Sequence, residues 1–202
     1  MTLAELRQQF KDMLNRSDID DTRADHFINM GIRRLERGLR LPFMEKSLAY
    51  TVDGDDDFLL AADHLELIGV FCNDVQLTRI TPAEGGKLLQ NPLSGTPTVY
   101  WRHGATMRLY PFPENDSVVE IRYYGEFENL GADDYETFEL SVIPDVILYA
   151  TLVYAADFYV DERKPIWQQT LSEIVKGVVD MAERDEFAGR DLRIGAPTDL
   201  EY

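Results

Sequence analysis

The chain has 202 residues, of which 45% are hydrophobic, and its 37 Asp and Glu against 20 Lys and Arg give a net charge of -17. This length allows one core with at most a modest insertion, and the composition predicts a folded chain. The charge argues against a protein that grips nucleic-acid phosphates or an anionic membrane surface. The single cysteine, Cys72, fits synthesis in a reducing cytoplasm.

The first part of the chain has apolar residues at helical spacing. Thr2 and Glu5 form a capping-box pattern ahead of a first amphipathic helix. A second helix is predicted from about Thr22 and should end before Pro42, because the residue before a proline disfavours helical geometry.

From Ser47 onward the apolar period changes to two, which predicts strands. The expected strands lie at 48–52, 65–71, 75–78, 98–102, 107–110 and 117–124. They should form a small sheet or barrel. Gly85 and Gly86 precede Lys87, but the other residues of a phosphate-binding loop are missing, so a turn is expected there.

Helical signals return at Pro144, and the apolar segment 146–156 predicts a central buried helix that is too short to span a membrane. A break at 161–164 precedes a last helix that should end near Gly189. We therefore expect an α+β fold in which the N- and C-terminal helices form a bundle with a central β-sheet or barrel insertion. The expected parts are a first bundle part at 1–46, a β-rich insertion at 47–125, a second bundle part at 126–190 and an extended tail at 191–202.

One acidic turn has part of a metal-binding pattern. Asp53, Asp55 and Asp57 match the first three ligand positions of a calcium loop. Phe58 and His64 stand where that loop needs glycine and a bidentate glutamate. A solvated turn is the interpretation we favour, with a cation site as the alternative.

Other candidates for chemistry lack a supporting context. His26, His64 and His103 are far apart in the sequence and do not have the spacing of metal ligands. Cys72 has no neighbouring residues that would mark a nucleophile. We therefore expect no catalytic, cofactor-binding or metal-binding residues, no cofactor, and a protein that is not an enzyme.

Charge is unevenly distributed along the chain. Four arginines share much of one exposed side of the second predicted helix: Arg33, Arg34, Arg37 and Arg40. All charged residues between Gly125 and Val160 are acidic, among them Asp133, Asp134 and Glu136. Both could simply be solvated faces. Alternatively, the basic helix of one copy faces the acidic loop of the next, in a head-to-tail contact that can close into a ring.

Several segments resemble tailed-phage head-to-tail adaptor proteins, and they occur in the same order. The N-terminal segments are FINMGIRRL at 27–35 and LPFMEK at 41–46. The later segments are GTP at 95–97 with Tyr100, LYPFP at 109–113, IRYY at 121–124 and IPDVILY at 143–149. The resemblance covers residues 2–188.

The resemblance implies a structural virion protein made in the host cytoplasm and located at the head-tail junction, in the virion neck. It implies a connector ring of twelve copies between the portal protein and a tail or nozzle protein, through which DNA passes during ejection without specific binding. It also implies that the C-terminal segment contacts the portal, and the contacts expected there are Leu192, Arg193, Ile194 and Leu200. A stopper or tail-completion protein is the alternative within this class, and an acidic DNA-mimic inhibitor is the alternative outside it.

Overall fold

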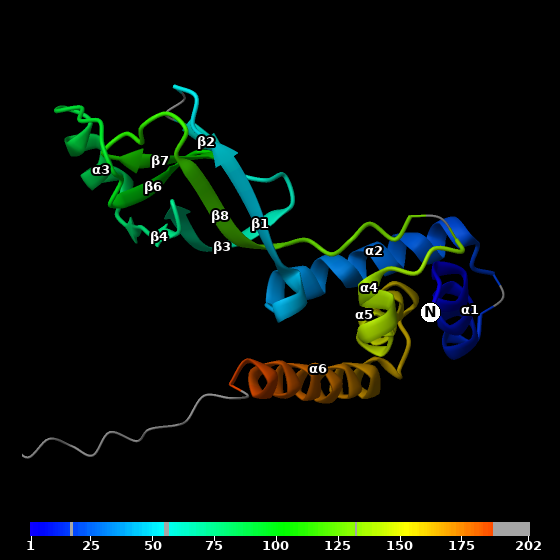
Figure 1. Ribbon diagram of the computed structural model, residues 1–202. Helices are drawn as coiled ribbons and strands as arrows, with labels where there is room; N and C mark the ends of the chain where they lie inside the picture. The colour runs from blue at the N-terminus through cyan, green and yellow to red at the C-terminus, as the bar shows by residue number, and fades with distance from the viewer. Residues whose placement is uncertain (17, 55–56, 132, 188–202) are drawn as a thin grey trace, which may run out of the picture.

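The computed structural model describes residues 1–16, 18–54, 57–131 and 133–187. These residues contain six α-helices, one short 3-10 helix and eight strands. Helices from both ends of the chain pack together, and the strands project from the end of α2 (Figure 1). The predicted α+β fold, with terminal helices flanking central strands, is confirmed. The domain boundaries given above stay a prediction.

The first two helices begin at side-chain caps. Helix α1, Leu3–Leu14, has the expected capping box, in which Thr2 and Glu5 bond each other's backbone N–H groups. Helix α2, Asp21–Gly38, is capped two residues before Thr22, where the Asp20 carboxylate accepts the Arg23 N–H at 2.8 Å. Asp20 satisfies a helix-end donor that would otherwise be unpaired, so the helix begins before Thr22.

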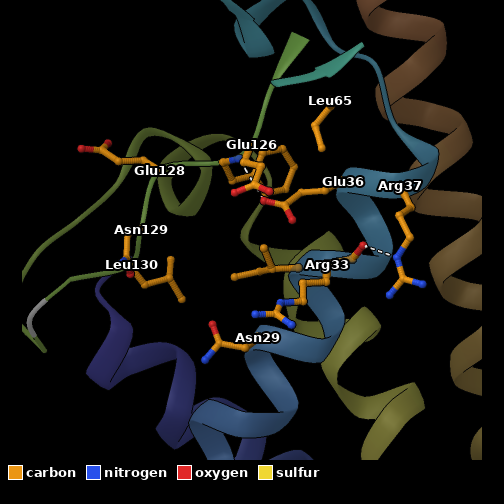
Figure 2. A pocket seen from close by; sticks show the side chains of 11 residues that line it. Asn29, Arg33, Glu36, Arg37, Leu65, Glu126, Glu128, Asn129 and Leu130 are labelled. Carbon is orange, nitrogen blue, oxygen red and sulfur yellow. Dashed lines mark hydrogen bonds between the residues drawn. The ribbon is translucent and has the colours of Figure 1, made fainter. Parts of the chain in front are cut away.

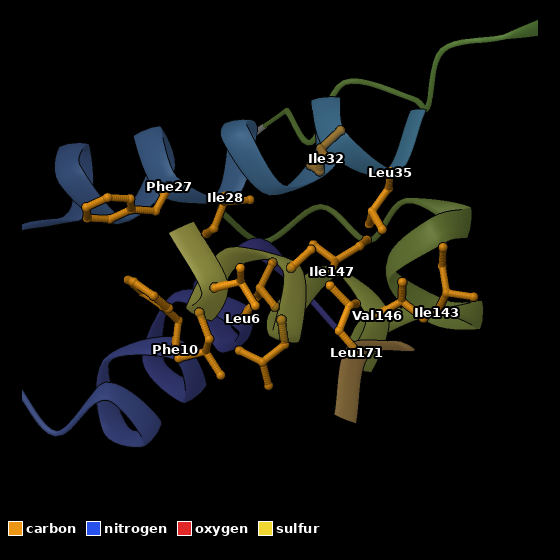
Figure 3. Close-up of a cluster of buried hydrophobic side chains, with 14 of the residues drawn as sticks. Leu6, Phe10, Phe27, Ile28, Ile32, Leu35, Ile143, Val146, Ile147 and Leu171 are labelled. Carbon is orange, nitrogen blue, oxygen red and sulfur yellow. The ribbon is translucent and has the colours of Figure 1, made fainter. Parts of the chain in front are cut away.

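Helix α5, Pro144–Tyr159, is the centre of the helical part. It lies against α1, α2, the short helix α4, Phe138–Val142, and the long helix α6, Lys164–Phe187 (Figure 3). Val146, Ile147 and Leu152 are completely buried, which confirms the predicted central helix. Burying side chains of this size stabilises the fold by about 1.5–3 kcal/mol each. None of the described helices combines the length and apolar character needed to cross a membrane.

Helices α2 and α5 approach each other closely at Gly31. A Cβ atom added there would lie 2.9 Å from the backbone nitrogen of Thr151 and 3.2 Å from the carbonyl carbon of Ala150. Real Cβ atoms essentially never show a contact as short as 2.9 Å, and 3.2 Å is tighter than nine in ten of their contacts. The missing side chain of Gly31 therefore sets the distance between the two helices that make the largest helical contact.

The strands form two four-stranded sheets where the sequence predicted one small sheet or barrel. The first has the order β1-β8-β3-β4, and the second has the order β2-β7-β6-β5. Their bounds are β1 Glu45–Thr51, β2 Asp57–Leu59, β3 His64–Cys72, β4 Val75–Gln76, β5 Thr78–Arg79, β6 Val99–His103, β7 Thr106–Tyr110 and β8 Val118–Gly125. All named pairs are antiparallel except β5 with β6. The two sheets share a hydrophobic core in which Val70, Met107 and Val119 are completely buried.

A short helix replaces the turn expected at Gly85 and Gly86. Helix α3, Pro82–Leu88, begins with a capping box between Thr81 and Glu84 and has a proline in its first turn. These are strong helix-start signals, and they outweigh the two glycines. Gly85 lies against the ring of Trp101, which is 2% exposed.

Two chain segments connect the helices with the strands. One runs from Leu39 through the 3-10 helix Pro42–Met44 into β1, and the other leaves β8 at Gly125. Lys46 in β1 links the two segments, because its ammonium group donates to the Glu126 carbonyl at 2.9 Å. It also donates to the Asp63 carboxylate, just before β3, at 2.7 Å.

Candidate functional site

The exposed side of α2 faces an open cleft at the junction of the helices and the strands (Figure 2). The cleft has a volume of about 500 Å³. Its walls come from α2, from Leu65 at the start of β3 and from the segment that follows β8: Asn29, Ile32, Arg33, Glu36, Arg37, Leu65, Glu126, Phe127, Glu128, Asn129 and Leu130. The basic helix and the beginning of the acidic segment therefore lie on opposite walls of one cleft within a single chain.

Two buried carboxylates fix the wall that follows β8. Glu36 on α2 accepts the Phe127 N–H at 3.0 Å, and Glu139 on α4 accepts the Glu128 N–H at 2.9 Å. Both glutamates are only 8% exposed. The two glutamates, on different helices, thus bind consecutive peptide groups of this wall. A hydrogen bond from an N–H group to a charged acceptor is among the stronger hydrogen bonds in a protein.

Burial raises the pKa of Glu36, and the nearby charges of Glu126 and Glu139 raise it further. The bond from Phe127 and the charge of Arg33 act in the opposite direction but are outweighed. The ionised form of Glu36 is therefore disfavoured in the folded protein.

Glu36→Gln is expected to stabilise the protein more at neutral than at acidic pH. A raised folded-state pKa means that the contribution of Glu36 to stability is complete below the ordinary glutamate pKa and is lost as the pH rises through the folded-state pKa. Glutamine keeps an oxygen for the Phe127 N–H but carries no charge.

Thermal unfolding of the wild type and Glu36→Gln from about pH 4 to about pH 8 measures this effect. The difference in Tm should grow as the pH rises. Glu114→Gln, at an exposed position, is the matched control and should show no such trend. A Tm difference for Glu36→Gln that is constant with pH contradicts the prediction.

The arginines predicted as contacts divide into two groups. Arg40 donates to the Glu66 carboxylate at 2.7 Å and to two backbone carbonyls, so it is used within the chain. Arg33, Arg34 and Arg37 are exposed and form no ion pair with any carboxylate that the structure describes. Arg37 donates to the Arg33 carbonyl at 3.0 Å, and the Arg34 guanidinium lies 5.9 Å from the Tyr154 ring centroid.

The acidic residues predicted as contacts are largely occupied within the chain. Arg7 on α1 donates to Asp133 at 2.5 Å and to Asp25 on α2 at 2.8 Å. The N-terminal ammonium group pairs with Glu136, whereas Asp134 is exposed. The acidic loop is thereby attached to the beginning of α1, and the two aspartates raise the pKa of Arg7.

A second cleft, with a volume of about 640 Å³, is mainly apolar. It lies between the 3-10 helix, the end of α4 and the C-terminal half of α6: Leu41, Pro42, Phe43, Val142, Ile143, Val178, Met181, Ala182 and Arg184. Met181 is 70% exposed there. The residues predicted to contact the portal, Leu192, Arg193, Ile194 and Leu200, lie outside the described residues.

Two of the remaining candidates from the sequence are ion-paired or buried within the chain. Asp57 pairs with Arg108, which lowers the pKa of the Asp57 carboxyl, while Asp55 lies outside the described residues. Cys72 is 1% exposed, and burial raises the pKa of its thiol, so the reactive thiolate is disfavoured. In the part of the chain that the structure describes, no three His, Cys, Asp or Glu side chains are grouped to hold a metal ion.

Exposed arginines therefore line the first cleft, and mainly apolar side chains line the second. The chain belongs to the SU10 adaptor protein family, whose family model matches residues 1–195. It is a phage adaptor protein, and the resemblance seen in the sequence is confirmed. No curated protein matches the chain.

Proposed function

We propose that the protein is a head-to-tail adaptor that forms a ring of twelve copies between the portal and the tail and surrounds the DNA channel of the virion neck. Membership of an adaptor family supports a role at this junction. The net charge of -17 supports a channel wall that repels phosphate and lets DNA pass without binding it. In the same proposal the C-terminal segment, with Leu192, Arg193, Ile194 and Leu200, contacts the portal.

The observation that carries the subunit contact is the set of unpaired arginines on α2. Arg7, Arg40 and Arg163 each pair with a carboxylate of the same chain. Arg33 and Arg37 remain exposed on the wall of the cleft and are free to meet acidic groups of a neighbouring copy, for which exposed Asp134 is suited. Opposite charges that meet across an interface fix its register and speed the encounter.

The apolar cleft is the second surface that assembly would cover. Exposed side chains such as Met181 and Val142 lose contact with water when another copy packs on them. At about 25 cal/mol per Å² of apolar surface, that burial favours association. We propose that a neighbouring copy occupies this cleft in the ring.

Size-exclusion chromatography with light scattering, followed by electron microscopy, tests the ring. The chain is examined alone and with the portal protein of the same phage, and a ring of the chain seated on the portal is the expected result. A chain that stays monomeric and unbound in the presence of the portal overturns the adaptor proposal.

Arg37→Glu is expected to weaken ring formation at least about tenfold, equivalent to about 1.4 kcal/mol. Lys87→Glu makes the same charge change on the exposed end of α3 and is the matched control. Titration of each variant onto portal rings, followed by light scattering, gives the comparison. If both variants assemble as the wild type does, the α2 contact is wrong although the ring proposal stands.

A further inference from the structure

A small cavity between the two sheets is lined by several basic groups. It has a volume of about 180 Å³. Its lining residues come from β3 and the segment before it, from β5, and from the hairpin of β6 and β7: Leu60, His64, Leu65, Glu66, Leu67, Arg79, Arg102 and Met107. Two arginines and a histidine from three separate strands therefore converge on one space.

The two arginines have no carboxylate partner among the described residues. The Arg79 side chain makes no hydrogen bond to any described residue, and the Arg102 Nε donates to the Gly104 carbonyl at 2.8 Å. The one carboxylate in the lining, Glu66, is already paired with Arg40 at 2.7 Å. The cavity thus holds an excess of positive charge within a chain of net charge -17.

His64 adds an unused polar atom. Its Nε2 atom is buried and has no hydrogen-bond partner in the structure. Burial and the charge of Arg102 lower the pKa of His64, and Asp63 and Glu66 oppose this shift without cancelling it. The imidazole is therefore neutral at neutral pH, and its charge state responds to charge that enters the cavity.

We propose that this cavity binds an oxyanion, a phosphate or a carboxylate group, between Arg79 and Arg102, with the ring of His64 beside it. Guanidinium groups suit both ligands, because their parallel N–H groups match pairs of anionic oxygens. A cavity of this volume has room for several waters of about 30 Å³ each, and hence for either group. Titration with phosphate and with acetate distinguishes a phosphate site from a carboxylate site. The proposal stands whether or not the chain forms a ring.

Nuclear magnetic resonance of the His64 ring in the full-length chain tests the proposal. Inorganic phosphate and sodium acetate are titrated separately, with sodium chloride holding the ionic strength constant. Saturable shifts of the His64 signals and a rise of the His64 pKa are expected, because a bound anion favours the protonated ring. Saturation with phosphate identifies a phosphate site, and saturation with acetate a carboxylate site.

Arg79→Gln is expected to raise the dissociation constant about tenfold. It removes no hydrogen bond of the described structure, so the fold should persist, and circular dichroism checks this. Lys87→Gln, at an exposed position outside the cavity, is the control and should bind as the wild type does. Arg102→Gln changes the other arginine of the cavity, which lies in β6, and is a second test of the same site. Linear shifts with both anions, or equal weakening in the control, overturn the proposal.

Discussion

Gly31→Leu is expected to lower the free energy of unfolding by about 3 kcal/mol or more, the upper range for an overpacked core. The reason lies in the backbone of α5. The Cβ of residue 31 would meet the nitrogen of Thr151 at 2.9 Å and the Oγ1 of Thr151 at 3.1 Å. Thr151 is completely buried, and its hydroxyl donates to the Ile147 carbonyl at 2.8 Å, so the contact cannot be relieved by turning a side chain. Helices α2 and α5 must separate.

Gly38→Ala is the matched control on the same helix, because no atom lies within 4 Å of a Cβ added there. It should be neutral or stabilise the protein by up to about 1 kcal/mol, since alanine favours helix over glycine. Urea unfolding followed by circular dichroism measures both variants. Equal stability of Gly31→Leu and the wild type would show that the two helices are less tightly packed than the structure indicates.

Gly85→Ala is expected to destabilise the strand part by about 3 kcal/mol. A Cβ at this position would lie 2.4 Å from two ring atoms of Trp101. Trp101 is among the largest buried side chains and lies in β6, so any movement of its ring disturbs the packing around it. Either α3 shifts away from the sheet or the ring leaves its preferred rotamer.

The neighbouring variant, Gly86→Ala, has no atom within 4 Å of its added Cβ and should leave stability unchanged or slightly raised. Tryptophan fluorescence during urea unfolding reports on Trp101, with Trp167→Phe as the background that removes the second indole. A Gly85→Ala protein that unfolds at the same urea concentration as Gly86→Ala would contradict the proposed contact.

Helices were predicted well because their ends are marked by local chemistry. Thr2 caps α1 as expected, and Pro144 opens α5. Helix α3 was not predicted, although Thr81 and Glu84 carry the same signal as Thr2 and Glu5. A cap binds neighbouring backbone groups, so it can be identified without knowing any distant contact.

Strand positions could be predicted, but strand partners could not. Alternating residues mark β1 and β8, yet their pairing joins Glu45 to Tyr124 and Thr51 to Val118. The alternation shows which residues share a face and contains no information on which strand lies alongside. The division into two sheets is therefore a result that the sequence pattern did not contain.

The site was predicted in part. The exposed arginines of α2 were found, but the pairing of Arg40 with Glu66 depends on where β3 lies. The roles of Glu36 and Glu139 were not predicted, although Glu36 follows Ile32 by four positions and so falls on the buried side of α2. That spacing was a usable signal for Glu36. For Glu139 the partner is a distant peptide group, and no local pattern marks it.

The two hydrophobic cores draw on different stretches of the chain. Every buried residue of the strand core lies between Val52 and Tyr123. The helical core combines residues up to Met44 with residues from Phe127 onward. During synthesis on the ribosome, the strand core is complete before α5 has been made, whereas α1 and α2 must wait for α5 to bury their apolar faces. Shielding of the early helices is thus a late event in biosynthesis, and chaperones that bind exposed apolar segments have their main opportunity in that interval.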